Sequence, residues 1–238
     1  MSFYRSLVLV ASFSALTAVS GCAKDPSKDA PAATVSEPAP EEAKPLEKPA
    51  EPAAPAIAPA TAPSPAAAAP VEGLALSGKI GFVGSKVTGS HSGEFREFKG
   101  TVALNNGKPE GGKLDFTVQT ASLFTTDANP FKEKLEGHLK SPDFFDVEKF
   151  PTAAFASSGI AAGGANGATH TVKGKLTLHG VTKDIEFPAT IAVAGKDITG
   201  KTEFSINRKD FGLVYAGKPD DLIRDGVVIK IDVKATLP

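Results

Sequence analysis

KGKLTLHGVTKDIEFPATI, residues 173–191, is the stretch that decides the fold. It holds two runs in which apolar and polar residues alternate, with His179 and Gly180 between them. In the second run Ile185 and Phe187 share one parity. Side chains of a strand point alternately to its two faces, and glycine is common in tight turns. The stretch therefore predicts two antiparallel strands joined by a short turn.

The alternation recurs through residues 73–238 and is clearest near the end of the chain. In residues 227–235 every second residue from Val227 onward is apolar, while Lys230, Asp232 and Lys234 take the opposite parity. Strands with one apolar and one polar face are typical of antiparallel sheets, and closure into a barrel leaves no unpaired edge. We therefore predict an all-β fold, a closed antiparallel barrel of about eight strands, a size at which the interior is either filled by side chains or holds one elongated ligand.

Residues 129–146 break the alternation. Asn129 followed by Pro130 is typical of a helix N-cap and the first helical position. The apolar residues that come next are four apart, as on one face of a helix: Phe131, Leu135 and Leu139. We predict one or two short helices here, lying across one end or side of the sheet.

The N-terminus has the features of a bacterial lipoprotein signal, residues 1–21. Arg5 precedes an apolar run, residues 7–19, which is shorter than the roughly 20 residues that span a membrane. The run ends on Val-Ser-Gly-Cys, which resembles a lipobox and predicts lipidation of Cys22. Since Ala23 and not an acidic residue follows, we expect a lipid anchor in the bacterial cell envelope, at the outer membrane facing the periplasm. A soluble secreted protein cut near this point is the alternative.

Residues 22–72 predict a disordered linker behind that anchor. Of the 19 prolines in the chain, 12 lie between Cys22 and Gly73, among many alanines and glutamates. Such a composition buries little apolar surface, so we expect an extended, solvated segment that lets the domain work away from the membrane. Residues 73–238 then form one domain of ordinary size.

Four segments of the domain resemble the YceI-like polyisoprenoid-binding family: SKVTGSHSGEFREFKGTVAL at 85–104, HLKSPDFFDVEKFPTAAF at 138–155, residues 173–191 and FSINRKDFGL at 204–213. The resemblance covers roughly residues 74–237. It implies a lipocalin-like barrel that holds a long isoprenoid chain, such as a quinone tail or a polyprenyl phosphate. The lipobox and linker depart from many members, and they favour short-range hand-over at one membrane.

Phenylalanine dominates the candidate ligand site. The chain has 15 phenylalanines and no tryptophan, and this rigid apolar ring needs no hydrogen-bond partner. The residues that we expect to line a cavity are Phe82, Phe98, Phe116, Phe144, Phe145, Phe155, Phe187, Phe204 and Phe211. Plain core packing is the alternative for each of them.

A polar head group would need different residues at the mouth of the cavity. A guanidinium grips phosphate or carboxylate with two hydrogen bonds, which makes Arg208 the leading candidate. His91, Lys183 and Tyr215 are weaker candidates. A structural pair between Arg208 and an aspartate that fixes the strand end is the alternative.

Several functional classes find no support in the sequence. There is no nucleophile elbow, phosphate loop or dinucleotide fingerprint, so we expect a non-enzyme without a cofactor. The four histidines lack metal-ligand spacing, and the single cysteine excludes a disulfide within the chain. A net charge of −1 without a basic block argues against nucleic acid. The rival to lipid binding is a filled structural or interaction module, recognisable by an interior too small for a ligand. The oligomeric state is left open, a homodimer included.

Overall fold

The computed structural model describes residues 23–38 and 73–238. The predicted signal peptide, Cys22 and residues 39–72 of the predicted linker lie outside the described residues. The helical elements are η1 (Pro26–Lys28), η2 (Thr120–Ser122), α1 (Lys132–Lys140), η3 (Ala165–Gly167) and η4 (Arg208–Phe211). The strands are β1 (Thr34–Ser36), β2 (Leu74–Ala75), β3 (Ser77–Lys86), β4 (Gly89–Phe95), β5 (Phe98–Asn105), β6 (Lys108–Gln119), β7 (Leu123–Thr125), β8 (Thr152–Ala162), β9 (His170–Leu178), β10 (Val181–Ala194), β11 (Asp197–Asn207), β12 (Gly217–Lys218), β13 (Asp221–Leu222) and β14 (Gly226–Thr236).

The hairpin expected around His179 and Gly180 is confirmed. β9 ends at Leu178, β10 begins at Val181, and the two strands pair antiparallel in that register. Both turn residues have positive φ, 52° at His179 and 74° at Gly180. This is the backbone of the two-residue turns whose twist matches that of the flanking strands.

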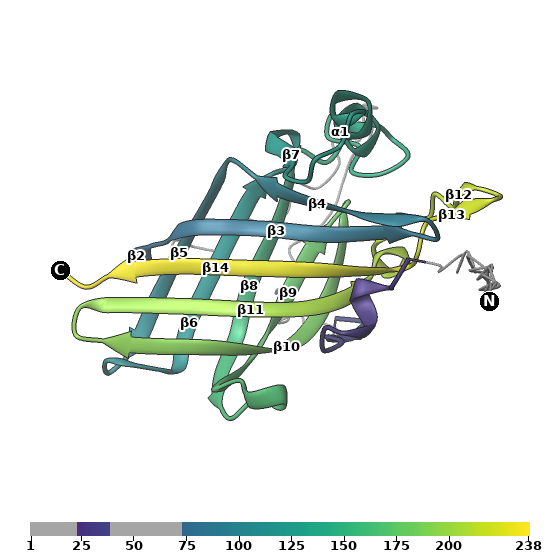
Figure 1. Cartoon of the computed structure of the whole chain (residues 1–238). Helices are drawn as coiled ribbons and strands as arrows, with labels where there is room; N and C mark the ends of the chain where they lie inside the picture. The colour runs from purple at the N-terminus through teal and green to yellow at the C-terminus, as the bar shows by residue number, and fades with distance from the viewer. Residues whose placement is uncertain (1–22, 39–72) are drawn as a thin grey trace, which may run out of the picture.

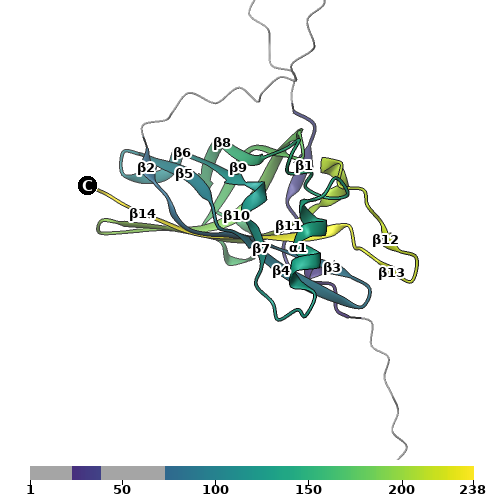
Figure 2. The same cartoon turned by 90° about the horizontal axis from the view of Figure 1, so that it is seen from above.

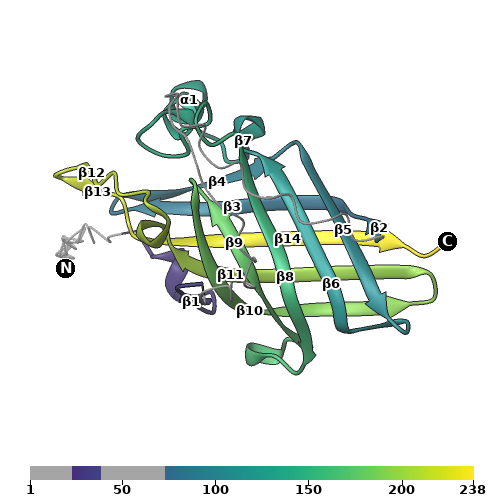
Figure 3. The ribbon, with the colours of Figure 1, turned by 180° about the vertical axis from the view of Figure 1, so that it is seen from behind.

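The strands form one strongly curled antiparallel sheet of 12 strands, in the order β2-β5-β6-β8-β9-β10-β11-β14-β3-β4-β7, with β1 added on β10. A separate small hairpin consists of β12 and β13. Figure 2 shows the curl from above, with β3, β11 and β14 in one layer and β5, β6, β8 and β9 facing them. Figures 1 and 3 show the two layers from the front and from behind. The all-β, antiparallel class is therefore as predicted.

The closed eight-stranded barrel is not confirmed, because the sheet is a half-barrel. Its hydrogen-bonded path ends at β2 and β7, and these two strands do not pair with each other in the described part of the chain. The reason lies at Arg96 and Glu97, where the chain bends between β4 and β5. β4 pairs with β3 and β7, whereas β5 pairs with β6 and β2, so the chain changes partners at this corner.

The core lies between the two layers, on the inner face that the alternation predicts. Ile231 and Ile80 are opposite each other on β14 and β3, and both are buried. Val172 of β9 on the facing layer has no exposed surface. Burial of this apolar inner face is the main force that stabilises the curl.

The helix α1 begins later than predicted. α1 starts at Lys132 with Phe131 as its N-cap, and Phe131 makes no side-chain capping bond. The carboxamide oxygen of Asn129 instead accepts a hydrogen bond from the Phe131 amide at 2.9 Å, which closes a local turn before the helix. α1 has no buried residue and Phe131 is 70% exposed, so the expected apolar helix face is not sealed against the sheet. The helix lies beside β7 (Figure 1).

Residues 23–38 are docked on the sheet, and the prediction that they are solvated linker was wrong. We call them the N-terminal strap; Figure 1 shows the strap in purple beside one end of β10 and β11. Its strand β1 pairs with β10 from Thr34↔Glu186 to Ser36↔Asp184. The reason is a free edge, because β10 pairs with β11 only from Thr190 onward. Backbone donors and acceptors on the first half of β10 are thus open to a third strand, whatever its side chains.

Candidate ligand site

A row of phenylalanine rings crosses the inner face of the sheet. Phe116 and Phe155 stack with ring centroids 5.3 Å apart, Phe155 lies 5.4 Å from Phe187, and Phe187 stacks on Phe204 at 4.3 Å. Phe155, Phe187 and Phe204 are each 2% exposed. A Cβ added to Gly174 would lie 2.6 Å from Cζ of Phe155, so this glycine lets the ring lie flat on the sheet. The rings therefore form a continuous, mostly buried apolar row from β6 to β11.

A second aromatic cluster joins β3 and β4 to the turn after α1. Phe82, Phe95 and Phe145 have ring centroids 5.8–6.0 Å apart. Gly93 of β4 makes room for the Phe82 ring, since a Cβ there would lie 2.8 Å from its Cε1. Phe95 was not among the predicted lining residues, although it belongs to the same cluster.

The other three predicted phenylalanines are spread around the core. Phe211 of η4 is fully buried, and Phe98 of β5 is half-buried against the core. Phe144 packs against the His138 ring of α1 at 5.0 Å and against Tyr215 at 5.4 Å. All nine predicted phenylalanines are therefore buried or half-buried, as both ligand lining and plain core packing require.

The interior cavity is small and mainly aliphatic. Its volume is about 50 Å³, below the roughly 300 Å³ at which typical ligand sites begin. Phe187 is the one predicted phenylalanine that borders it. The other main lining residues are Leu76, Val102, Leu104, Leu114, Ile160, Val172, Ala189, Ile191, Ile198, Ile231 and Val233. Sequence reasoning missed these as site residues, although several carry the inward parity of their strands.

The weaker head-group candidates each have a partner within the protein. His91 Nδ1 lies 2.8 Å from Asp127 Oδ2. Burial raises the pKa of Asp127, but hydrogen bonds from His91 and from the backbone outweigh it and hold that pKa below the usual range. Lys183 pairs with Glu37 of the strap, and Tyr215 packs edge-on against the His138 ring at 5.0 Å. The three residues come from separate elements, and each has a different partner.

Arg208 is 3% exposed, and its guanidinium holds the connection between β11 and β14. It donates from Nε to Arg224 O at 3.0 Å, from Nη1 to Leu213 O, and from Nη2 to Ile223 O at 3.3 Å. Nη2 also lies 3.4 Å from Asp225 Oδ1. Burial lowers its pKa, which the nearby Asp225 carboxylate partly offsets. This is the structural Arg–Asp arrangement, and these donors serve the loop.

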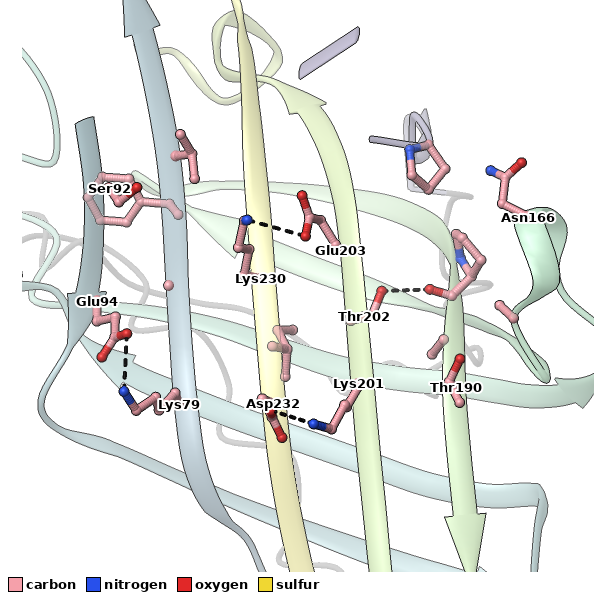
Figure 4. A pocket seen from close by; sticks show the side chains of 18 of the residues that line it. Lys79, Ser92, Glu94, Asn166, Thr190, Lys201, Thr202, Glu203, Lys230 and Asp232 are labelled. Carbon is pink, nitrogen blue, oxygen red and sulfur yellow. Dashed lines mark hydrogen bonds and ion pairs between the residues drawn. The ribbon is translucent and has the colours of Figure 1, made fainter. Parts of the chain in front are cut away.

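A hollow of about 670 Å³ lies on the outer face of β11, β14, β3 and β4 (Figure 4). Charged side chains cover its floor and pair across strands. Lys201 and Asp232 are 2.9 Å apart, Lys230 and Glu203 3.3 Å, and Lys79 and Glu94 3.5 Å. Such cross-strand pairs suit a solvated sheet face and do not suit a hydrocarbon.

Metal and membrane-spanning features can be stated for residues 23–38 and 73–238 only. Within them no group of three or more His, Cys, Asp or Glu residues could hold a metal ion. His179 packs on the Phe150 ring at 4.5 Å, whereas His91 is bonded to Asp127. No helix of this part of the chain is long and apolar enough to cross a membrane.

Comparison with known proteins identifies the domain. The model of the YceI-like domain matches residues 76–235. The chain belongs to the YceI-like family. A UPF0312 protein of Pseudomonas savastanoi pv. phaseolicola is 40% identical over 131 residues, which cover 52% of this chain and 65% of that protein. The match thus spans less than two thirds of that relative.

One solved structure resembles the fold of the domain well enough to compare. The crystal structure of Burkholderia cenocepacia BcnA has a TM-score of 0.57 and 28% identity, and the match covers 66% of this chain and 96% of BcnA. A polyisoprenoid binding domain from Saccharophagus degradans is 17% identical with a TM-score of 0.49, over 67% of this chain and 94% of that domain. The second likeness is too weak to bear on the ligand of this YceI-like domain.

Proposed function

We propose that this YceI-like protein binds a long apolar molecule, of the polyisoprenoid class, between the layers of its curled sheet. The observation that carries the proposal is the aromatic row Phe116–Phe155–Phe187–Phe204, which continues into the aliphatic cavity without a charged group between them. Lys201 borders the cavity but pairs with Asp232 on the outer face. Binding without catalysis needs no more than this surface, since each buried methylene-sized group contributes about 0.8 kcal/mol.

Ligand entry requires the interior to expand. A cavity of about 50 Å³ cannot take a chain of several prenyl units, so inner side chains must give way as the ligand enters. The half-barrel form favours this, because the two layers meet at the Arg96–Glu97 bend without pairing between β2 and β7. The layers can separate there at a lower cost in hydrogen bonds than in a closed barrel.

The sequence of the N-terminus supports a place of action at the bacterial envelope. The signal-like residues 1–21 and Cys22 support a lipid-anchored protein of the bacterial envelope, with the outer membrane facing the periplasm as the expected site. Two acyl chains suffice for stable anchoring. An anchored binder would hand its ligand over at short range.

A filled interaction module is the second candidate, and the cavity volume favours it. The rings of β6, β8, β10 and β11 pack on one another, and the cavity beside them measures only about 50 Å³. In that case the paired charges of the outer face would be the surface presented to a partner.

Native mass spectrometry of the full chain, purified from bacterial membranes and followed by lipid extraction, separates the two candidates. Lipid binding predicts a stoichiometric long-chain adduct beyond the mass of the acylated protein. An empty protein that also fails to take up an added polyprenol or quinone would rule out the lipid-binding proposal and favour the interaction module.

A further inference from the structure

The strap fixes the start of the described chain at one end of the sheet. The Ala23 amide donates to Val87 O, in the β3–β4 turn, at 3.2 Å. Arg224 Nη2 donates to Ala23 O at 2.6 Å, and Arg224 Nη1 lies 3.2 Å from Asp25 Oδ2. Burial alone would raise the pKa of Asp25, but hydrogen bonds from Ser27 and Arg224 hold it below the usual range. The first residues of the strap are therefore held at this end of the sheet by backbone bonds and by a charge pair.

The next residues of the strap fit the sheet closely. Ser27 of η1 packs on Gly226 at the start of β14, where an added Cβ would lie 2.6 Å from the Ser27 Cβ. Further along, Ala33 N donates to Ser205 O and Ser205 N donates to Pro31 O, both at 2.8 Å. The strap, from Ala23 onward, is thus held against this end of the sheet.

The same end carries exposed apolar side chains. The connection between β11 and β14 projects here as the β12–β13 hairpin, on the side opposite the C-terminus (Figure 1). Val214 is 65% exposed and Leu222 is 48% exposed on this connection. Lys218 and Asp220 are exposed between them, so the local charges balance. A charge-balanced turn flanked by exposed apolar side chains suits the interface of a bilayer, where apolar groups and polar head groups meet.

We propose that the strap orients the protein on the membrane, with the β12–β13 hairpin and the strap's first residues against the bilayer. This rests on the anchoring at Cys22 given under Proposed function and adds the orientation to it. The domain then lies at the membrane surface and not at the far end of a linker. Tyr215 lies on the same β11–β14 connection and packs on the buried Phe144 ring at 5.4 Å, so aromatic side chains lie at the end that faces the bilayer.

Nitroxide labels at the two ends of the sheet test the orientation. The acylated full chain is bound to phosphatidylethanolamine/phosphatidylglycerol vesicles and carries a label at Lys218→Cys or at Ala194→Cys, with Cys22 blocked by its acyl group. β11 has 11 residues and links the two ends, which places the labels about 35 Å apart along the sheet. Collision with oxygen, relative to a water-soluble nickel chelate, reports whether each label lies in lipid or water.

We expect the label at position 218 to favour oxygen and the label at 194 to favour the nickel chelate. Gly226→Ala should move the 218 label into water by displacing the strap, and adding Ser27→Gly should restore it. Lys28→Ala, on the exposed side of the strap, is the matched control and should change nothing. Equal, water-like accessibility at both positions on bound, acylated protein would overturn the orientation alone. A Cys22 that still reacts with a thiol reagent would overturn the anchor and the orientation together.

Discussion

Phe187→Ala is the substitution that tests the interior most sharply. Phe187 is 2% exposed, stacks on Phe204 at 4.3 Å, packs on Phe155 at 5.4 Å and borders the cavity. Truncating a buried phenylalanine to alanine costs about 3–5 kcal/mol. For a domain of this size each kcal/mol lowers the melting temperature by about 2–4 °C. We therefore expect a fall of about 6–20 °C in thermal unfolding followed by circular dichroism.

The enlarged cavity makes the same variant a test of ligand binding. A polyprenol at about 100 times its dissociation constant adds about 2.7 kcal/mol of stability, which corresponds to about 5–11 °C. We expect the ligand to raise the melting temperature of Phe187→Ala by this amount. Phe131→Ala is the matched control, since the 70% exposed Phe131 ring contributes less than about 0.5 kcal/mol. If no long apolar ligand stabilises either Phe187→Ala or the unaltered protein, the reasoning about the interior is refuted.

Three further predictions concern single side chains. Ala189→Val should fill part of the cavity, keep the melting temperature within a few degrees, and weaken polyprenol binding measured by titration; undiminished binding would place the ligand elsewhere. Arg208→Ala should cost about 2–4 kcal/mol in denaturant unfolding, because it leaves buried carbonyl groups without donors; a stable variant would contradict the loop-holding role. A hydrogen bond from the Thr125 backbone lowers the pKa of Glu136 below its usual 4.5. The ionised Glu136 carboxylate therefore stabilises the fold above pH 4.5, and this contribution is lost as pH falls through the lower pKa of the folded state. Tyrosine fluorescence of Tyr215 should report α1 loosening at that acidic pH, and Glu136→Gln should remove the transition.

The strands could be predicted from the sequence because their signal is local. Alternation at residues 227–235 and the His179–Gly180 turn depend on neighbours in the chain, and the structure confirms both. The open edge of the half-barrel could not be predicted in this way, because it depends on which partners β4 and β5 take on either side of Arg96.

The docking of the strap and the lining of the cavity could not be predicted from the sequence, because both depend on contacts between segments far apart in the chain. An Ala/Pro/Glu composition indicates solvation, yet β1 pairs through its backbone with an edge of β10 that is free only because β11 joins it from Thr190 onward. The cavity lining depends on how two layers face each other, so the aromatic pattern pointed to Phe155 and Phe204 while the gap itself lies among aliphatic residues such as Val172. The sequence allowed Arg208 either a head-group role or a structural pair with an aspartate. It did not identify that aspartate, because Asp225 lies 17 residues further along the chain.

The most direct test of the central claim is an intermolecular NOE experiment on the protein with ¹³C-labelled phenylalanine and valine, saturated with an unlabelled polyprenol. Binding between the layers predicts contacts from the isoprenoid methyl groups to the rings of Phe155, Phe187 and Phe204 and to the methyl groups of Val172. Contacts confined to residues of the outer face, such as Val83, or no contacts at all, would contradict ligand binding inside the sheet.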